Sequence, residues 1–395
     1  MKRMIILALC LLLAALPLLA TAEEAVIPDL TVKQWDIPDT EGMAFLRKMG
    51  VGWVLGNTFD AHAQNFNGDE MGLETYWCGV KTTEDMIKAI HEAGYSTLRL
   101  PVSWHNHVDA DFNISEAWLS RVEEVARWAL NSGMYVILNT HHDEGYDWFY
   151  PDEAHFETSS RYLTAIWTQL SQRFADCDEH LIFENLNEPR LTKDKAHEWS
   201  LDENDAGCRE AMDCINRLHQ VFVDTVRAAG GCNVDRYLMI SSYDASVDGA
   251  KSELFHLPKD TVEDRLIVSV HAYTPYSFAL DTRGTKEYSV NVMANTAAVA
   301  TFMNDLYHMY IEQGIPVVIG EFGAVNKDNL QARVEFTAYY TASAIARGMP
   351  VCWWDNNARR GNGENFAIFN RKGLSWYFPE IRDAMIRYSK RLDAE

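Results

Sequence analysis

Short apolar runs alternate with longer amphipathic segments along almost the whole chain from residue 51 onward. The apolar runs are continuous, which is typical of strands buried on both faces of a parallel sheet. The segments between them repeat apolar residues every three to four positions and several end at glycine, as helices do. Strands are predicted at residues 51–57, 96–102, 135–142, 181–189, 237–243, 265–274, 316–323 and 350–355, and helices at 83–93, 115–131, 159–175, 209–229, 251–256, 295–312, 329–347 and 374–392.

Eight strand–helix pairs of this kind predict an α/β protein with a single (β/α)8 barrel, the TIM-barrel architecture. An open doubly wound sheet would be expected to carry a glycine-rich phosphate turn after its first strand, and the Leu55-Gly56-Asn57-Thr58 segment is not such a turn. No repeat, Ser/Pro/Gly linker or low-complexity tract divides the chain. We therefore expect residues 23–395 to form one domain.

Residues 1–22 have a different pattern. Lys2 and Arg3 precede an apolar run, and Ala20-Thr21-Ala22 is a small-x-small cleavage site. This pattern predicts a signal peptide that is removed, because the run is too short and wrongly flanked for a membrane anchor. We expect a secreted or periplasmic protein that is not attached to a membrane after cleavage.

The charge of the chain restricts its partners. A formal net charge of −22 disfavours nucleic acid and anionic lipid, whereas a neutral polysaccharide remains compatible. Twelve tryptophans exceed what most chains of this length carry, and stacked sugar rings require such side chains. Trp77, Trp104, Trp148 and Trp199 fall in segments between strands and helices and are candidates for sugar stacking.

The cysteines show no metal-binding spacing. Six follow the predicted signal peptide, with no CxxC pair among them. One or two disulfides remain possible, with Cys208 and Cys214 nearest in sequence, and free buried thiols are the equal alternative. No cofactor or metal is predicted. Calcium binding by the acidic segment 202–205 stays open, although a solvated loop is favoured.

Two predicted strands end at a glutamate. The run from Leu181 ends in Asn187-Glu188-Pro189, where the proline stops the strand, and the run from Pro316 ends at Glu321. In a parallel barrel the active site lies where the strands end. Two carboxyl groups about 5 Å apart are what glycoside hydrolysis with retention requires, one as proton donor and one as nucleophile.

The other strand ends are rich in polar and aromatic side chains, and only the fifth strand ends without a clear candidate. Beside the two glutamates, the candidate substrate-binding residues are Asn57, Arg99, His141, His142, Asn187, His271, Tyr273 and Trp354. Glu184 lies earlier in its strand than Glu188, so a structural role inside the barrel is favoured for it.

The chain resembles glycoside hydrolase family 5 (cellulase family A), in the endo-β-1,4-glucanase branch. Seven segments carry the resemblance in family order, and the Cys78-Gly79-Val80 segment departs from it. The segments are Gly52-Trp53-Val54-Leu55-Gly56-Asn57-Thr58-Phe59-Asp60, Arg99-Leu100-Pro101-Val102-Ser103-Trp104, Asn139-Thr140-His141-His142-Asp143, Glu184-Asn185-Leu186-Asn187-Glu188-Pro189, His271-Ala272-Tyr273, Ile319-Gly320-Glu321-Phe322-Gly323 and Trp353-Trp354-Asp355-Asn356.

The resemblance implies a retaining enzyme with Glu188 as acid/base and Glu321 as nucleophile. Glu188 is expected to stay protonated and Glu321 ionised, with Arg99 and Tyr273 donating hydrogen bonds to Glu321. Of the remaining candidates, His271 would orient its neighbours, Asn187 would bind the sugar 2-hydroxyl, His141 and His142 would form polar walls, and Trp354 would be an aromatic platform.

These features predict an exported, monomeric endo-β-1,4-glucanase whose partner is a β-glucan polysaccharide or oligosaccharide. The same machinery tuned to xyloglucan, mixed-linkage glucan, mannan or xylan stays open, because loop geometry decides the substrate. An inactive carbohydrate-binding barrel is a third alternative. A metal-dependent hydrolase with His141, His142 and Asp143 as ligands is a fourth.

Overall fold

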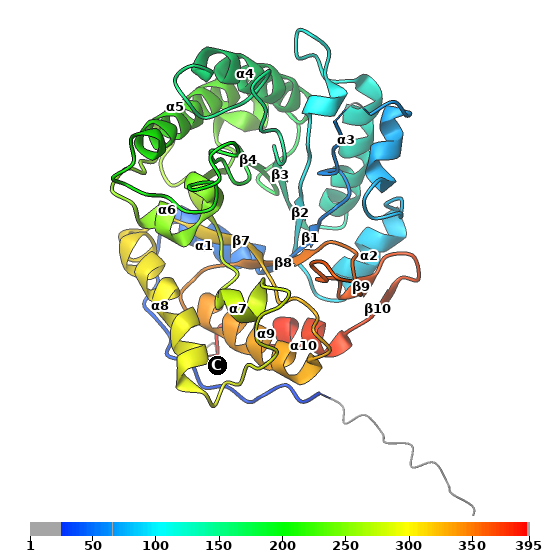
Figure 1. Ribbon diagram of the computed structural model, residues 1–395, viewed down its shortest axis with the longest axis vertical. Helices are drawn as coiled ribbons and strands as arrows, with labels where there is room; N and C mark the ends of the chain where they lie inside the picture. The colour runs from blue at the N-terminus through cyan, green and yellow to red at the C-terminus, as the bar shows by residue number, and fades with distance from the viewer. Residues whose placement is uncertain (1–24, 65, 393–395) are drawn as a thin grey trace, which may run out of the picture.

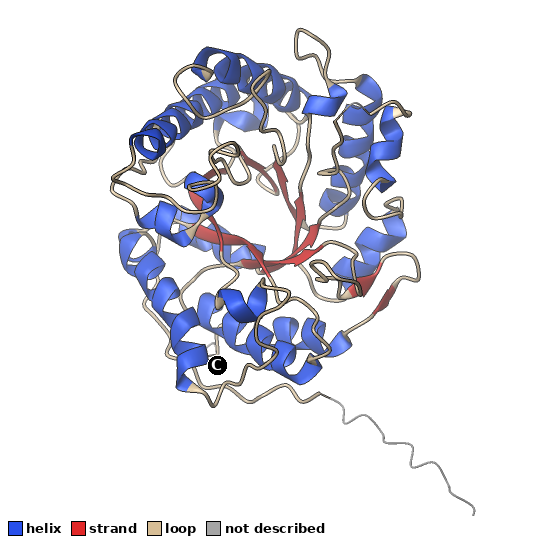
Figure 2. Cartoon of the chain, viewed as in Figure 1, coloured by secondary structure: helices blue, strands red, loops and turns tan. Residues whose placement is uncertain are grey.

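A computed structural model describes residues 25–64 and 66–392. The predicted signal peptide, residues 1–22, lies outside the described residues. Eight parallel strands form a closed barrel in which each strand pairs with its neighbours in sequence and β8 pairs with β1 (Figures 1 and 2). The strands are β1 Val51–Leu55, β2 Thr97–Leu100, β3 Tyr135–Asn139, β4 Leu181–Glu184, β5 Leu238–Ser241, β6 Leu266–His271, β7 Val317–Phe322 and β8 Val351–Asp355.

The predicted (β/α)8 barrel is therefore confirmed. Each predicted strand contains an observed strand, but several end earlier than predicted. The clearest case is β4, which ends at Glu184 rather than at Pro189. The backbone N–H of Asn185 still bonds to the neighbouring strand at Met239, and Leu186 onward belongs to the loop that follows. The polar residues Asn187 and Glu188 thus stand just above the strand end, where parallel barrels carry their active sites.

Helices surround the barrel (Figure 1). Side chains cap the starts of some of them: Thr83 accepts from the backbone N–H of Met86, and Asp205 accepts from that of Cys208. The helices are α1 Glu41–Met49, α2 Glu84–Glu92, α3 Glu116–Asn131, α4 Phe156–Arg173, α5 Ala206–Ala228, α6 Val247–Lys251, α7 Tyr276–Ala279, α8 Met293–Met309, α9 Leu330–Ile345 and α10 Pro379–Arg387. Short 3-10 helices are η1 Glu70–Thr75, η2 His105–His107, η3 Gly231–Val234, η4 Tyr243–Ala245 and η5 Ile311–Gln313.

Three helix predictions need correction. The closing helix was expected at 374–392, but α10 is shorter, and residues before it form a small hairpin of β9 (Phe369–Asn370) and β10 (Ser375–Trp376). The short helix expected at 251–256 was placed too late in the chain: α6 ends at Lys251, and its start is capped by the Ser246 side chain, which accepts from Gly249 N–H. The N-terminal α1 was missed. It lies behind the barrel strands in Figure 1.

The inside of the barrel is apolar except for a few polar side chains that hydrogen-bond to one another. All six described cysteines are free, so no disulfide forms among the described residues, and Cys208 and Cys214 lie on the same helix, α5.

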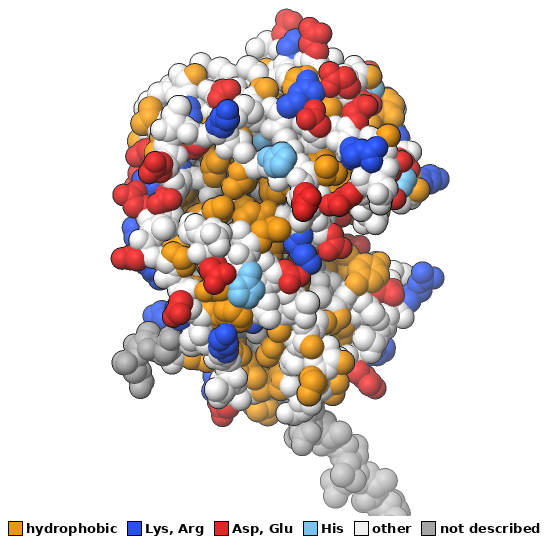
Figure 3. All heavy atoms as spheres, turned by 90° about the vertical axis from the view of Figure 1, so that its left-hand side faces the viewer, with side chains coloured by type: hydrophobic (Ala, Val, Ile, Leu, Met, Phe, Trp, Pro, Cys, Tyr) orange, Lys and Arg blue, Asp and Glu red, His pale blue; other side chains and the backbone are white. Residues whose placement is uncertain are grey.

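Among residues 25–64 and 66–392, no helix has the length and apolar character needed to cross a bilayer. Acidic and basic side chains are interspersed on the face shown in Figure 3, without a continuous basic patch.

Candidate active site

Glu188 and Glu321 face each other across the mouth of the barrel. Glu188 follows β4, and Glu321 is part of β7. One oxygen of each carboxyl group and one ring nitrogen of His271 all lie within 4.8 Å of one another. Carboxyl groups about 5 Å apart suit double displacement, because inversion needs a wider gap that admits water. The spacing therefore agrees with the retaining pair expected from the sequence.

Arg99 is the centre of the hydrogen-bond network below this pair. Its guanidinium is fully buried and donates from Nε to Glu184 (2.8 Å), from Nη1 to Glu321 (2.6 Å) and from Nη2 to Asn187 (2.7 Å). Burial alone lowers the pKa of Arg99, but the charges of Glu184 and Glu321 raise it above its ordinary value. A permanent cation thus holds the Glu321 carboxylate and the Asn187 amide in fixed positions.

Glu184 has the structural role expected for it. It is fully buried in the barrel and accepts hydrogen bonds from Arg99, from Asn139 Nδ2 (3.0 Å) and from Ser269 Oγ (2.6 Å). Its carboxylate balances the charge of Arg99, so that neither group is buried without a partner. Glu184 therefore orients Arg99, and through it the groups at the strand ends.

Tyr273 and His271 bind the two glutamates from β6 and the loop after it. The Tyr273 hydroxyl donates to Glu321 Oε2 at 2.9 Å, as predicted. His271 Nδ1 lies 2.7 Å from Glu188 Oε1 and 3.8 Å from Glu321 Oε1, so the ring hydrogen-bonds to Glu188 and lies near Glu321. Glu321 therefore accepts hydrogen bonds from Arg99 and Tyr273, and His271 Nδ1 lies nearby.

The directions of the pKa shifts differ from the expectation of a protonated Glu188. Burial raises the pKa of Glu188, but the hydrogen bond and charge of His271 outweigh burial and lower it to about 2. Burial raises the pKa of Glu321, against the lowering by His271 and Arg99. Burial lowers the pKa of His271, but Glu321 and Glu188 raise it above its ordinary value. The opposite directions of these two shifts favour a shared proton on His271, one hydrogen bond from Glu188.

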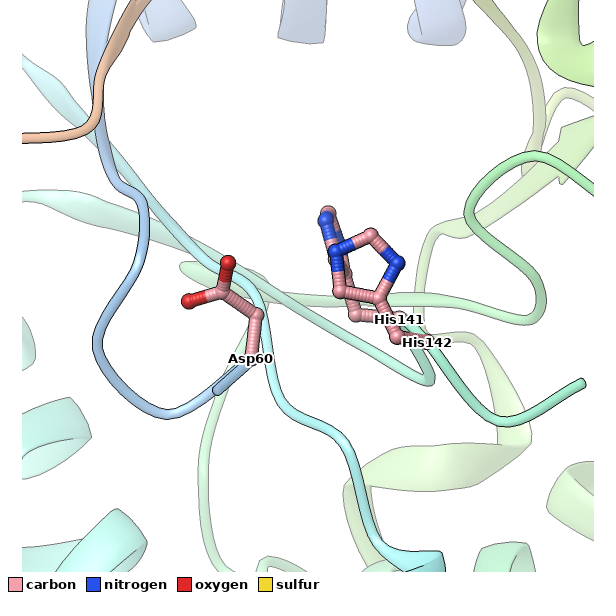
Figure 4. A group of neighbouring side chains, drawn as sticks. All are labelled: Asp60, His141 and His142. Atoms are coloured by element: carbon pink, nitrogen blue, oxygen red, sulfur yellow. The ribbon is translucent and has the colours of Figure 1, made fainter. Parts of the chain in front are cut away.

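His141 and His142 line the cleft, and the fully buried Asp60, a residue the sequence analysis did not single out, lies beside them. Their potential ligand atoms lie within 4.8 Å of one another, and Figure 4 shows the two rings facing the Asp60 carboxylate across a small gap. Burial lowers the pKa of His141 well below its ordinary value and that of His142 to about 3, so both rings are neutral.

Several polar atoms of this group already have partners in the protein. The two Asp60 oxygens accept from the backbone N–H groups of Asn57 (2.9 Å) and Thr58 (2.6 Å), and His141 Nδ1 bonds to Asn139 Nδ2 at 3.1 Å. Asp143, the third ligand of the metal alternative, turns away and accepts from the backbone of Trp104 and His105. The predicted trio His141, His142 and Asp143 is therefore not brought together as a metal site, and a polar wall remains the better interpretation.

Trp354 lies at the end of β8 and lines the cleft, as expected for an aromatic platform. Its ring is parallel to that of His141, with an angle of 1° and a centroid distance of 5.8 Å. Gly56 packs against the indole so closely that a Cβ there would come within 2.7 Å of the ring. A glycine at this position is thus required for Trp354 to lie flat over the barrel mouth.

The four candidate stacking tryptophans have different outcomes. The prediction that Trp104 stacks on sugar is wrong, because this side chain is fully buried and its Nε1 donates to the backbone carbonyl of Asn139. Trp199 lines the cleft and is 58% exposed, which suits a contact with substrate. Trp77 is 39% exposed beside His142, and Trp148 stacks on His105 with a centroid distance of 4.9 Å.

The cleft has a volume of about 770 Å³. All the predicted site residues except Arg99 line it, and Arg99 lies directly beneath. Residues that sequence reasoning missed also line it, chiefly Asp244 after β5 and Glu364 after β8. The end of the fifth strand therefore also contributes a polar side chain, Asp244, to the cleft. Asp244 has φ +59°, a conformation that Asp tolerates in turns, and no local motif indicates it.

Comparison with known proteins identifies the family. Residues 59–360 match the model of the cellulase family, glycosyl hydrolase family 5. The chain belongs to glycosyl hydrolase family 5. Its curated relatives include Endoglucanase B of Ruminococcus albus, which is 44% identical over 354 residues, 89% of this chain and 81% of the relative.

Solved family 5 structures agree with the fold. A mutant of a glycoside hydrolase 5 lichenase from Caldicellulosiruptor sp. F32, in complex with cellotetraose, has a TM-score of 0.91 at 49% identity, over 93% of this chain and all of that one. A GH5-4 broad specificity endoglucanase from Ruminococcus champanellensis, with bound cellotriose, has a TM-score of 0.82 at 40% identity, over 89% of this chain and all of that one. The resemblance stated from the sequence is thus confirmed.

Proposed function

We propose that this family 5 protein is an exported endo-β-1,4-glucanase that cleaves internal bonds of β-glucan chains with retention. The observation that carries the proposal is the pair Glu188 and Glu321, whose carboxyl oxygens lie within 4.8 Å of each other in a 770 Å³ cleft. The hydrogen bonds from Arg99 and Tyr273 to Glu321 support its role as an ionised nucleophile. The endoglucanases among its relatives support the substrate class.

In the first step, the Glu321 carboxylate attacks the anomeric carbon while the glycosidic bond breaks. Glu188 gives a proton to the departing oxygen, and His271, hydrogen-bonded to it, supplies that proton. The product of this step is a glycosyl ester of Glu321. In the second step Glu188 accepts a proton from water, the water oxygen attacks the same carbon, and Glu321 leaves as carboxylate. Asn187, held by Arg99, is placed to bind the 2-hydroxyl of the sugar.

The solved relatives differ in the polysaccharide that their names indicate. The solved relatives include a lichenase and endoglucanases described as having broad specificity. A mixed-linkage β-glucan is therefore the second candidate substrate. Assaying one preparation on cellulose derivatives, mixed-linkage glucan, xyloglucan, mannan and xylan at equal mass concentration would separate these substrates. Activity on mannan or xylan alone would contradict the β-glucan proposal.

Export is supported by the sequence pattern of residues 1–22. Expression of the full chain in a bacterium should yield a processed protein outside the cytoplasm whose N-terminus is Glu23, because the small residues before it fit signal peptidase. N-terminal sequencing of the mature protein measures this directly. Retention of the intact N-terminus in the cytoplasm would contradict export.

Cleavage of internal bonds predicts a specific change in the viscosity of soluble cellulose. The cleft is lined by residues from loops on opposite sides of the barrel mouth, including Trp199 and Trp354, so that rings on both sides of the scissile bond have contacts. Internal cutting shortens chains rapidly. We expect viscosity to fall well before reducing ends accumulate. Release of cellobiose alone from the start, with viscosity tracking reducing ends, would show exo action instead.

Trp354→Ala should slow the reaction more than any other single tryptophan change. The indole lies beside His141 at the end of β8, next to the two glutamates, so its loss removes the platform under the reacting sugar. We expect kcat/KM to fall at least tenfold, or about 1.4 kcal/mol. Trp77→Ala, at the exposed rim, is the matched control with a smaller expected loss. A larger loss for Trp77→Ala than for Trp354→Ala would contradict the assignment.

A further inference from the structure

A second cluster of metal-ligating side chains lies outside the active site, where the loop after β4 meets the start of α5. One ligand atom each of His197, Asp205 and Cys208 lies within 4.8 Å of the other two. The three residues come from two segments: His197 from the loop, and Asp205 and Cys208 from the N-cap and first turn of the helix. Imidazole, carboxylate and thiolate together form a ligand set that Zn²⁺ accepts in proteins.

The groups around this cluster suit a bound cation. His197 Nδ1 bonds to Asp194 Oδ2 at 2.7 Å, which leaves Nε2 as the nitrogen that can bind a metal. A carboxylate behind a histidine ligand is the usual arrangement at zinc sites. Asp194, Asp202 and Asp205 all lie close enough to His197 to act on it electrostatically, so the neighbourhood is negative.

The cysteine is also placed to act as a ligand. Cys208 is fully buried, and its sulfur does not bond to another described cysteine. The backbone amide of Asp202 hydrogen-bonds to the sulfur. The side chain of His197 is 25% exposed, so water can reach the cluster from that side and complete a tetrahedral site.

We propose that His197, Asp205 and Cys208 bind a single structural Zn²⁺ ion that fixes the loop of residues 191–205 to the start of α5. The loop matters because it carries Trp199, two residues after His197, into the cleft. Near His197 the loop is attached by the Tyr243 hydroxyl, which donates to the His197 carbonyl at 2.8 Å, and by the Arg190 guanidinium, which stacks on the Trp199 ring at 3.9 Å. Towards α5 it is attached by Arg209, which donates to the Glu203 carbonyl at 2.9 Å. An ion at His197 would add a direct link between the loop and α5.

Isothermal titration of the chelator-treated full-length protein with ZnCl₂ tests the proposal. We expect one saturable site per chain in the wild type, and at least a hundredfold weaker binding in His197→Ala and in Cys208→Ser. Asp194→Ala should weaken binding about 10–100-fold, because it removes only the group that orients the histidine. Asp205→Asn keeps an oxygen that can cap α5 and should also weaken binding. Cys214→Ser, a buried cysteine elsewhere on α5, is the matched control and should bind as the wild type does.

Cobalt substitution and hydrogen exchange distinguish this site from other metal-binding groups. Co²⁺ should give a thiolate-to-cobalt charge-transfer band in the wild type and Cys214→Ser, but not in Cys208→Ser. Zn²⁺ should slow amide exchange in residues 191–205. The proposal would be overturned by the absence of a saturable zinc site in the wild type, by zinc binding unchanged in Cys208→Ser, or by a preference for Ca²⁺ over Zn²⁺. These measurements do not depend on hydrolysis, so they stand apart from the proposed function.

Discussion

Glu321→Ala should abolish nearly all hydrolysis, with a loss on the order of 10⁵–10⁶-fold in kcat, the scale for removing a covalent nucleophile. Its carboxylate is held by Arg99 at 2.6 Å and by Tyr273 at 2.9 Å, and neither donor can replace it in attacking the anomeric carbon. Oligosaccharide binding should be largely retained, because the aromatic and amide contacts of the cleft remain. Steady-state kinetics and titration with a cello-oligosaccharide measure the two effects separately.

A small anion gives the sharper test of the same assignment. In Glu321→Gly or Glu321→Ala the missing carboxylate leaves room for azide or formate on the face from which Glu321 attacks. Either anion should partly restore turnover of an activated glycoside, and the azide product should have the inverted anomeric configuration. Glu184→Gln is the matched control: it changes a buried glutamate that does not line the cleft, so anions should not rescue any loss it causes. Near-native turnover of Glu321→Ala would disprove the nucleophile assignment.

Glu188→Ala should slow substrates with poor leaving groups about 10²–10⁴-fold in the first step, the usual contribution of general acid catalysis. Aryl glycosides whose leaving group needs no proton should lose far less in that step. The reason is positional: Glu188 shares a 2.7 Å hydrogen bond with His271 and lies close to Glu321, within reach of the bond that Glu321 attacks. A leaving-group series measured as kcat/KM checks this expectation. Equal slowing of all substrates would contradict the acid role.

The pH profile of kcat/KM should be bell-shaped, and its alkaline limb should belong to Glu188, His271 and Glu321 as a unit. The pKa of His271 is raised by Glu321 and Glu188, so the unit keeps the proton it must deliver until the pH rises through that raised pKa. Activity is therefore lost as this proton leaves. His271→Asn, which cannot hold the proton, should move the alkaline limb, and an unmoved limb would show that His271 does not share the proton.

The sequence alone was sufficient to predict the barrel and to place Glu188 and Glu321 together. Continuous apolar runs separated by amphipathic segments admit few arrangements other than a parallel barrel. In such a barrel the carboxyl ends of all strands converge, so Glu188 and Glu321 could be placed together although they are far apart in the chain. Arg99, Asn187, His271 and Tyr273 follow from the same rule, since each lies at or next to a strand end.

Only the tertiary structure decided how these side chains pair and which other residues join them. The sequence gives no sign that one arginine binds Glu184, Asn187 and Glu321 together, because that depends on three strands converging on a buried point. It also could not show that His271 lowers the pKa of Glu188, because that effect depends on distances of a few ångströms between groups from different strands.

Loop residues were the least predictable from the sequence, for a physical reason. A strand fixes the direction of its side chains by alternation, but a loop residue points wherever packing leads it. Trp104 therefore turned inward to bond Asn139, whereas Trp199 lies in the cleft. Asp244 and Glu364 reach the cleft from loops without a motif. The cysteine spacing likewise hid the cluster of Cys208 with His197 and Asp205, because a loop brings the histidine to the helix only in the folded chain.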